Sequence, residues 1–179
     1  MLIHSTSVKS ALAILEASAL DPLGATNQRY AVPRVPGVFF NYITGAIAHA
    51  CAQQDARENM WGEVCFAFTA TPHMRRSRKC YQRCAGCVHV PDSAPLPNVA
   101  ALRKHVLRVL QKLASSDAAL FCLTHEVVVF DRVQLSSSNR VVVACFTRRA
   151  FARIKRVFPA ARYVPVGTNM QELFFMLKN

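Results

Sequence analysis

Three cysteines near the middle of the chain are the residues whose types and spacing most directly suggest chemistry. Cys80, Cys84 and Cys87 follow one another within a short segment, and His73 and His89 flank them. Three thiolates and one imidazole make a closed tetrahedral shell for a zinc ion. The sequence therefore predicts a zinc site formed by the three cysteines with His89 or His73, and unliganded thiols or a redox pair are the alternatives.

The same segment is strongly basic, and a second basic cluster follows in a helix nearer the C-terminus. Lysine and arginine side chains in such clusters bind the phosphates of a nucleic-acid backbone, and Tyr81 offers a ring on which a base could stack. A solvated surface or a nuclear localisation signal fits the same composition. The first cluster consists of Arg75, Arg76, Arg78, Lys79 and Arg83, and the second of Arg148, Arg149, Arg153, Lys155 and Arg156.

Three separated segments carry a more specific pattern. Residues 2–15 read LIHSTSVKSALAIL, residues 36–41 read PGVFFN, and residues 124–135 read THEVVVFDRVQL. In this order they resemble motifs of the ADP-ribosyltransferases. The first is similar to the L-x-H-G-T opening of the diphtheria-toxin and PARP-like branch, and the second to the G-[IV]-[YF]-F strand. The third is similar to the A-E-F-L-V-x-D-R-V-P strand of the DarT-type DNA ADP-ribosyltransferases.

The resemblance implies that NAD⁺ is the substrate and that the first segment holds its nicotinamide side. His4 would hydrogen-bond a ribose of NAD⁺, while the backbone of Ser5 and the adjoining Thr6 would face the nicotinamide amide. A histidine at the end of a buried strand suits this role, because one ring nitrogen can donate to a hydroxyl while the other is held by the protein. The alternatives are that His4 only caps the first helix or that it is a satisfied, half-buried histidine.

The second segment and the loop before it would complete the NAD⁺ site. Gly37 opens the strand, and the resemblance implies that Phe39 or Tyr42 stacks on the nicotinamide ring. Arg29 and Arg34 lie in the preceding loop, and guanidinium groups suit the NAD⁺ diphosphate. The alternative is that the aromatic residues belong to the core.

The third segment places Glu126 at the position of the catalytic glutamate. A carboxylate there would hydrogen-bond the ribose 2′-OH, stabilise the oxocarbenium ion that forms as nicotinamide leaves, and accept a proton from the incoming nucleophile. Without the resemblance, a lone glutamate at the start of a strand is usually a solvated residue of an edge strand.

The hydrophobic pattern predicts the elements that would position these residues, in an α+β fold. We expect the split arrangement of two small, mainly antiparallel sheets flanked by helices, as in the ADP-ribosyltransferases. A loop at 21–36 and a long inserted loop at about 72–97 interrupt the expected strands and helices. The expected strands are 2–3, 37–41, 63–70, 120–123, 127–130, 141–146 and one near Tyr163, and the expected helices start near Ser5–Ser7, Ile43, Asn98, Arg148 and Asn169.

Composition limits the class of protein. With 179 residues, 52% of them hydrophobic, the chain suits a single folded domain at residues 1–179 rather than a disordered segment. The formal net charge of +12 favours a nucleic-acid partner, although a protein acceptor remains open. No signal peptide or membrane-spanning run is found, so we expect an intracellular protein of the cytoplasm or nucleus with no membrane partner.

Departures from the family pattern keep two other functions open. Ser5 stands where the family has glycine, a tyrosine expected in the helix after Phe40 falls near Ala50, and an arginine expected after the second segment falls near Ile43. These differences are compatible with a catalytically inactive interaction protein of the same fold. The cysteine cluster is compatible with a non-enzymatic, zinc-containing module that binds nucleic acid.

Overall fold

The fold is built around a mixed sheet that is mostly antiparallel, with helices on both sides. The computed structural model describes residues 1–22, 38–60, 62–69, 80–84, 95–96, 104, 125–129, 132–136 and 140–179. The sheet has the order β10-β9-β4-β1-β3-β7-β5-β6, and a two-stranded sheet pairs β2 with β8. The strands are β1 (Leu2–Thr6), β2 (Ala19–Leu20), β3 (Val38–Tyr42), β4 (Val64–Phe68), β5 (Cys80–Cys84), β6 (Pro95–Leu96), β7 (His125–Val129), β8 (Val133–Gln134), β9 (Val141–Cys145) and β10 (Arg162–Tyr163).

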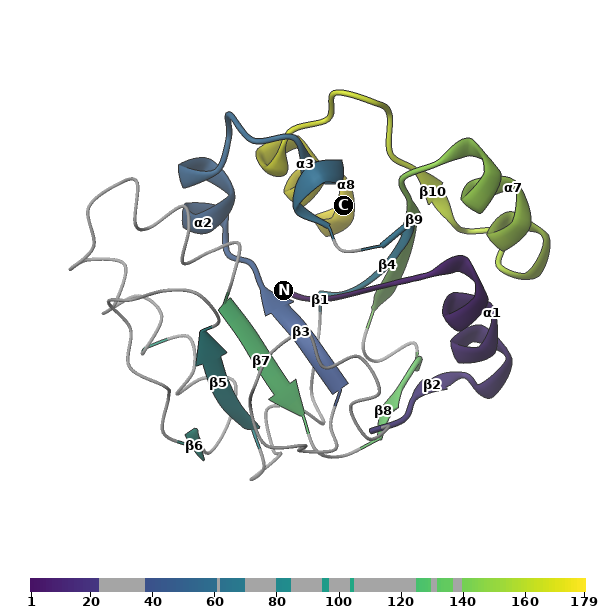
Figure 1. Ribbon diagram of the computed structural model, residues 1–179, viewed down its shortest axis with the longest axis horizontal. Coiled ribbons are helices and arrows are strands. Elements are labelled where there is room, and N and C mark those ends of the chain that lie inside the picture. The colour runs from purple at the N-terminus through teal and green to yellow at the C-terminus, as the bar shows by residue number, and fades with distance from the viewer. Residues whose placement is uncertain are drawn as a thin grey trace.

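Helices cover both faces of the part of the sheet that contains β4 and β9. Figure 1 shows α1 and α7 on one side of these strands and α2, α3 and α8 on the other. All five residues of β4 are buried, as expected for a strand covered on both faces. The helices are α1 (Val8–Ala17), α2 (Gly45–Ala50), α3 (Ala56–Asn59), α7 (Arg148–Val157) and α8 (Met170–Lys178).

Side-chain caps fix where the main helices begin. Ser7 accepts a hydrogen bond from the N–H of Ser10 at the start of α1, and Thr147 accepts one from Ala150 at the start of α7. Asn169 forms a capping box with Glu172 before α8. These groups satisfy N–H groups that have no partner within a helix. The predicted helices at Arg148 and after Asn169 are confirmed, and the first predicted helix begins after Ser7.

The segment at 72–97 differs from its prediction as an inserted loop, because β5 and β6 lie within it. β5 pairs with β7 along its whole length, from Cys80↔Val129 to Cys84↔His125. The prolines, cysteines and arginines of this segment give no strand pattern in the sequence. The strand forms because its backbone pairs with the apolar strand β7. The expected strand at 120–123 and almost all of the helix expected after Asn98 lie outside the described residues.

Gly62 lies in backbone contact with the end of β1. A Cβ atom added at Gly62 would lie 2.3 Å from the carbonyl oxygen of Thr6 and 2.8 Å from its nitrogen. Both distances are shorter than van der Waals contact, and both atoms belong to the backbone. Any other residue at this position must therefore displace β1.

Within the part of the chain described here, no helix is long and apolar enough to cross a bilayer.

Two buried cysteines, Cys65 and Cys145, lie on the neighbouring strands β4 and β9. Burial raises the pKa of the Cys65 thiol to about 12, and the nearby Cys145 adds to the shift. Burial, together with the Glu63 carboxylate, raises the pKa of Cys145 to about 11. Both thiols therefore stay protonated at neutral pH and behave as small apolar side chains.

We predict that Gly62→Ala lowers the free energy of unfolding by about 1–3 kcal/mol, the usual range for overpacking. Denaturant unfolding would measure the change. Gly45→Ala is the matched control, because a Cβ atom there would meet Phe174 at 3.7 Å, an ordinary contact, in the first turn of α2. Equal stability of the two variants would contradict the close approach of Gly62 to β1.

The raised pKa values of the Cys65 and Cys145 thiols predict that the folded protein becomes less stable at alkaline pH. Because their pKa values are raised in the folded protein, the unfolded thiols ionise first, near the ordinary thiol pKa of 9.0. The thiol contribution to stability is therefore complete below about pH 9 and is lost as the pH rises toward the folded values. Urea unfolding at pH 8 and pH 10.5 should show a smaller fall for Cys65→Ala than for wild type. An identical fall in both proteins would exclude a contribution from Cys65.

Candidate functional site

The candidate site lies where β1 and β3 separate in the middle of the sheet. β1 pairs with β4 along its full length, as far as Thr6↔Val64. Its pairing with β3 contains only Leu2↔Tyr42 and Ile3↔Asn41. Figure 1 shows β1 running away toward α1 while the start of β3 lies apart from it. We call this place the fork, formed by residues 4–6 of β1 and 38–40 of β3.

The backbone of Ser5 faces the fork. Met1 exchanges two hydrogen bonds with Ile43, at 3.1 Å and 2.9 Å, so Met1 points its polar backbone groups toward β3. In an antiparallel strand these groups alternate between the two neighbours, so those of Ile3 and Ser5 also point toward β3. The described ladder ends at Ile3↔Asn41. Among the described residues, the N–H and C=O of Ser5 therefore point into the fork beyond the last pair of the β1–β3 ladder, opposite Phe39.

The Ser5 side chain is turned away from this backbone edge. Its hydroxyl donates to the sulfur of Met60 at 3.4 Å, and Met60 is buried at the end of α3. A side chain pinned against α3 leaves the backbone of Ser5 as the group that faces the fork. Sequence reasoning missed Met60, since nothing in the sequence places it beside β1.

His4 lies on the opposite face of β1 and is held by an aromatic row. Its ring stands edge-on to Phe40, with centroids 5.9 Å apart and an interplanar angle of 67°. Phe40 in turn meets Phe68 edge-to-face at 5.6 Å and 90°, and both phenylalanines are fully buried. The half-buried imidazole is therefore oriented by the core behind it.

Glu126 is carried by an interior strand of the sheet. β7 lies between β3 and β5, and Glu126 is opposite Asn41 on one side and Arg83 on the other. Among the described strands, β7 is therefore not at the edge of the sheet. The row Ile3, Asn41 and Glu126 runs across the sheet just beyond the closed end of the fork. Asn41 lies in the second sequence segment, whose pattern did not indicate a role for it.

Arg132 and Val133, which are neighbours in the third sequence segment, attach the chain there to the residues at the end of α1 and in and after β2. Arg132 forms an ion pair with Asp21 at 3.2 Å and donates to the carbonyl of Ala17. Val133 is fully buried and pairs with Leu20 in the small β2–β8 sheet. These contacts hold Leu20 and Asp21, where the loop predicted at 21–36 begins.

Tyr42, one of the two residues predicted to stack on a ligand ring, belongs to the core. It is 5% exposed and pairs with Leu2 at the closed end of the fork. Phe39, the other, is placed by its backbone at the open end. The remaining predicted ligand residues Arg29, Arg34 and Gly37 and the basic residues Arg75, Arg76, Arg78 and Lys79 lie outside the described residues.

The predicted zinc ligands do not fit the strand that carries two of them. Cys80 and Cys84 occupy the two ends of β5, so about 13 Å of extended backbone separates their Cα atoms. Sulfur atoms bound to one zinc ion lie at most about 4.6 Å apart. The two cysteines therefore cannot share one ion. Cys87 and His89 lie outside the described residues, within which no cluster of three or more potential metal ligands occurs.

Comparisons with known proteins identify the fold. No family model matches the chain, and no curated protein matches it. Among solved structures it is similar to the structure described as Thermus sp. 2.9 DarT in complex with NAD+, with 13% sequence identity and a TM-score of 0.51. The match covers 91% of this chain and 94% of that one. The chain therefore has an ADP-ribosyltransferase-like fold, as its three sequence segments predicted.

Proposed function

We propose that this protein is an NAD⁺-dependent ADP-ribosyltransferase whose acceptor is a nucleic acid. The observation that carries the proposal is the fork, where the backbone groups of Ser5 have no ladder partner. The fold is shared with a protein whose structure was solved with NAD⁺. A central strand that leaves polar backbone groups unpaired needs another partner for them, and a bound ligand is one such partner.

The unpaired groups of Ser5 are complementary to the carboxamide of nicotinamide. A primary amide carries one carbonyl acceptor and an NH₂ donor. The N–H of Ser5 would donate to the amide oxygen, and its C=O would accept from the amide nitrogen. Both bonds come from the backbone, so the proposal tolerates serine where related sequences have glycine, provided that the hydroxyl stays on Met60.

Phe39 and His4 would hold the ligand on either side of this amide contact. Phe39 lies at the open end of the fork, and its ring would stack on nicotinamide. His4 is already oriented by Phe40, and its imidazole would bind a ribose hydroxyl of NAD⁺. Arg29 and Arg34 would neutralise the diphosphate from the loop that starts beyond the Asp21–Arg132 ion pair.

Glu126 would act on the reacting ribose. The glycosidic bond between C1′ and the nicotinamide nitrogen breaks, and nicotinamide leaves as a neutral base with the electron pair. The Glu126 carboxylate would stabilise the resulting oxocarbenium ion through the ribose 2′-OH. A nitrogen or oxygen of the acceptor then bonds to C1′ and gives its proton to Glu126.

The charge of the chain favours a nucleic-acid acceptor over a protein. A formal net charge of +12 attracts a phosphate backbone at long range and raises the rate of encounter. A protein acceptor is the second candidate, and a labelled lysate would reveal it. Binding of NAD⁺ without transfer would identify an inactive protein of the same fold.

We predict that Glu126→Gln lowers ADP-ribose transfer at least about 100-fold, because the amide is isosteric but cannot stabilise positive charge or accept the proton. Transfer is measured with labelled NAD⁺ and single-stranded DNA, RNA or lysate. Glu16→Gln is the matched control, since Glu16 is exposed on α1, and it should transfer normally. Undiminished transfer by Glu126→Gln would refute the mechanism.

Alanine variants of His4 and Ser5 should distinguish the proposed contact of the His4 ring with NAD⁺ from the proposed contacts of the Ser5 backbone. His4→Ala should weaken NAD⁺ binding about tenfold, the effect of one lost hydrogen bond. Ser5→Ala should change it less than about twofold, because the backbone contacts remain and the hydroxyl contacts Met60. Calorimetric titration with NAD⁺ measures both. A larger loss in Ser5→Ala than in His4→Ala would overturn the assignment of roles.

A further inference from the structure

A stripe of arginines runs along one side of α7, next to α1. We propose that this stripe, Arg149, Arg153 and Arg156 together with Lys9 of α1, binds the phosphate backbone of a nucleic-acid strand and leads it toward the fork. The inference deepens the proposed function and rests on it for the identity of the acceptor.

The two helices that carry the stripe begin at the end of the sheet where the fork opens. Thr6, Val64 and Cys145 form one row across β1, β4 and β9. β1 passes from Thr6 into the Ser7 cap of α1, and β9 passes from Cys145 toward the Thr147 cap of α7. Lys9 and Arg149, each in the first turn of its helix, therefore lie at the same end of the sheet as Ser5.

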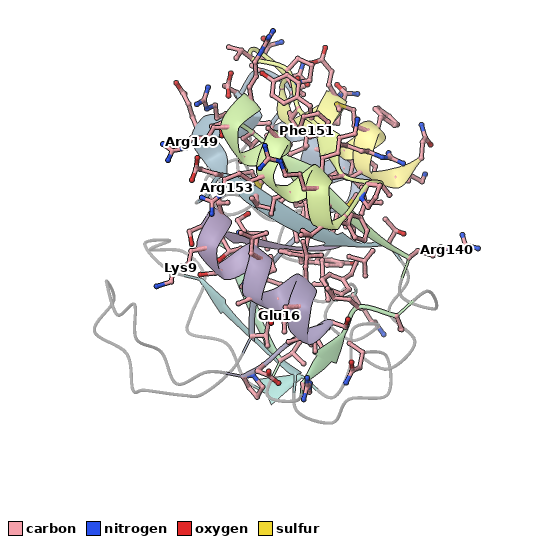
Figure 2. All side chains as sticks on the ribbon, turned by 90° about the vertical axis from the view of Figure 1, so that its right-hand side faces the viewer. Lys9, Glu16, Arg140, Arg149, Phe151 and Arg153 are labelled. Atoms are coloured by element: carbon pink, nitrogen blue, oxygen red, sulfur yellow. The ribbon has the colours of Figure 1, made fainter. Side chains whose placement is uncertain are left out.

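The spacing of the arginines places them on one side of α7. Residues at i, i+4 and i+7 share one side of a helix, and α7 turns Ala150 and Ile154, both fully buried, toward the core. Arg149 to Arg156 covers about 10 Å of helix axis, which corresponds to about three phosphate spacings along one strand of B-form DNA. Figure 2 shows Arg149, Arg153 and Lys9 on the same side of the paired helices, with Arg140 on the other.

The charges of the stripe are not neutralised within the described part of the protein. The ion pair found there joins Arg132 to Asp21, and it involves no residue of α7 or Lys9. At the start of α7, the Glu63 carboxylate accepts a hydrogen bond from the Thr147 hydroxyl. Arginine in the first turn opposes the helix dipole, and Arg149 repels Arg153 at i+4. An anionic ligand would relieve both unfavourable interactions.

The stripe suits a phosphate backbone better than a membrane surface. A membrane-binding helix turns an apolar face outward, whereas the apolar face of α7 is buried against the sheet. Guanidinium groups form paired hydrogen bonds with phosphate oxygens. Lys155 lies on the other flank and is engaged with the Phe151 ring at 5.0 Å, so it is not part of the stripe.

The test compares two double variants that each remove two positive charges. Arg149→Gln/Arg153→Gln removes half of the stripe, and Arg140→Gln/Lys178→Gln removes exposed cations elsewhere. Fluorescence anisotropy with labelled single-stranded DNA of about 20 nucleotides, without NAD⁺, measures affinity against salt. We expect the stripe variant to bind about tenfold or more weakly. Its slope of log K against log salt should fall by about 1.4, or 0.7 per lost contact.

The control variant should lose no more than about twofold. Equal losses in both variants, or none in the stripe variant, would overturn the proposal, since net charge alone would then explain binding. Binding to phosphatidylserine vesicles or polyglutamate that needs the stripe, while DNA binding does not, would also overturn it. NAD⁺ affinity is measured on the same proteins. A wild type that binds DNA through the stripe but not NAD⁺ would refute the proposed enzyme and leave the strand-binding surface intact.

Discussion

The structure depends on a backbone ladder that stops early. β1 is central in the sheet and is fully paired with β4, but its pairing with β3 ends after Ile3↔Asn41. Continued pairing would give an ordinary sheet with every backbone group satisfied and no place for a ligand. The interruption leaves the N–H and C=O of Ser5 facing Phe39, and unpaired polar groups in a central strand are costly unless something else binds them. We infer that NAD⁺ supplies that partner.

The surrounding core keeps the fork in place. The aromatic row of His4, Phe40 and Phe68 packs one face of β1, and Met60 holds the Ser5 hydroxyl on the other. Gly62 lets the chain after α3 pass against Thr6 with no room for a side chain. The same end of the sheet starts α1 and α7, so the cationic stripe and the fork are products of one topology.

Local patterns in the sequence predicted much of the fold. The α7 helix was predicted to start near Arg148, and it begins there. β3, β4 and β9 were found from their apolar runs. Elements that depend on partners distant in sequence were missed: β5 has little hydrophobic pattern of its own, and the short β2 and β8 strands exist only by pairing with each other. The zinc prediction is not supported for the same reason, since spacing along the chain did not reveal the extended strand between Cys80 and Cys84.

The geometry of the proposed site could not be predicted from the sequence. The sequence resemblance named His4, Ser5 and Glu126, yet nothing in it indicated that the ladder ends after Ile3 or that Tyr42 is core. Backbone hydrogen exchange of Ser5, read by NMR with and without NAD⁺, tests the central claim most directly. We predict fast exchange of the Ser5 amide and slow exchange of Ile3 in the free protein, with Ser5 becoming protected when NAD⁺ binds. A Ser5 amide that is already protected without NAD⁺, or that NAD⁺ leaves unchanged, would contradict the account.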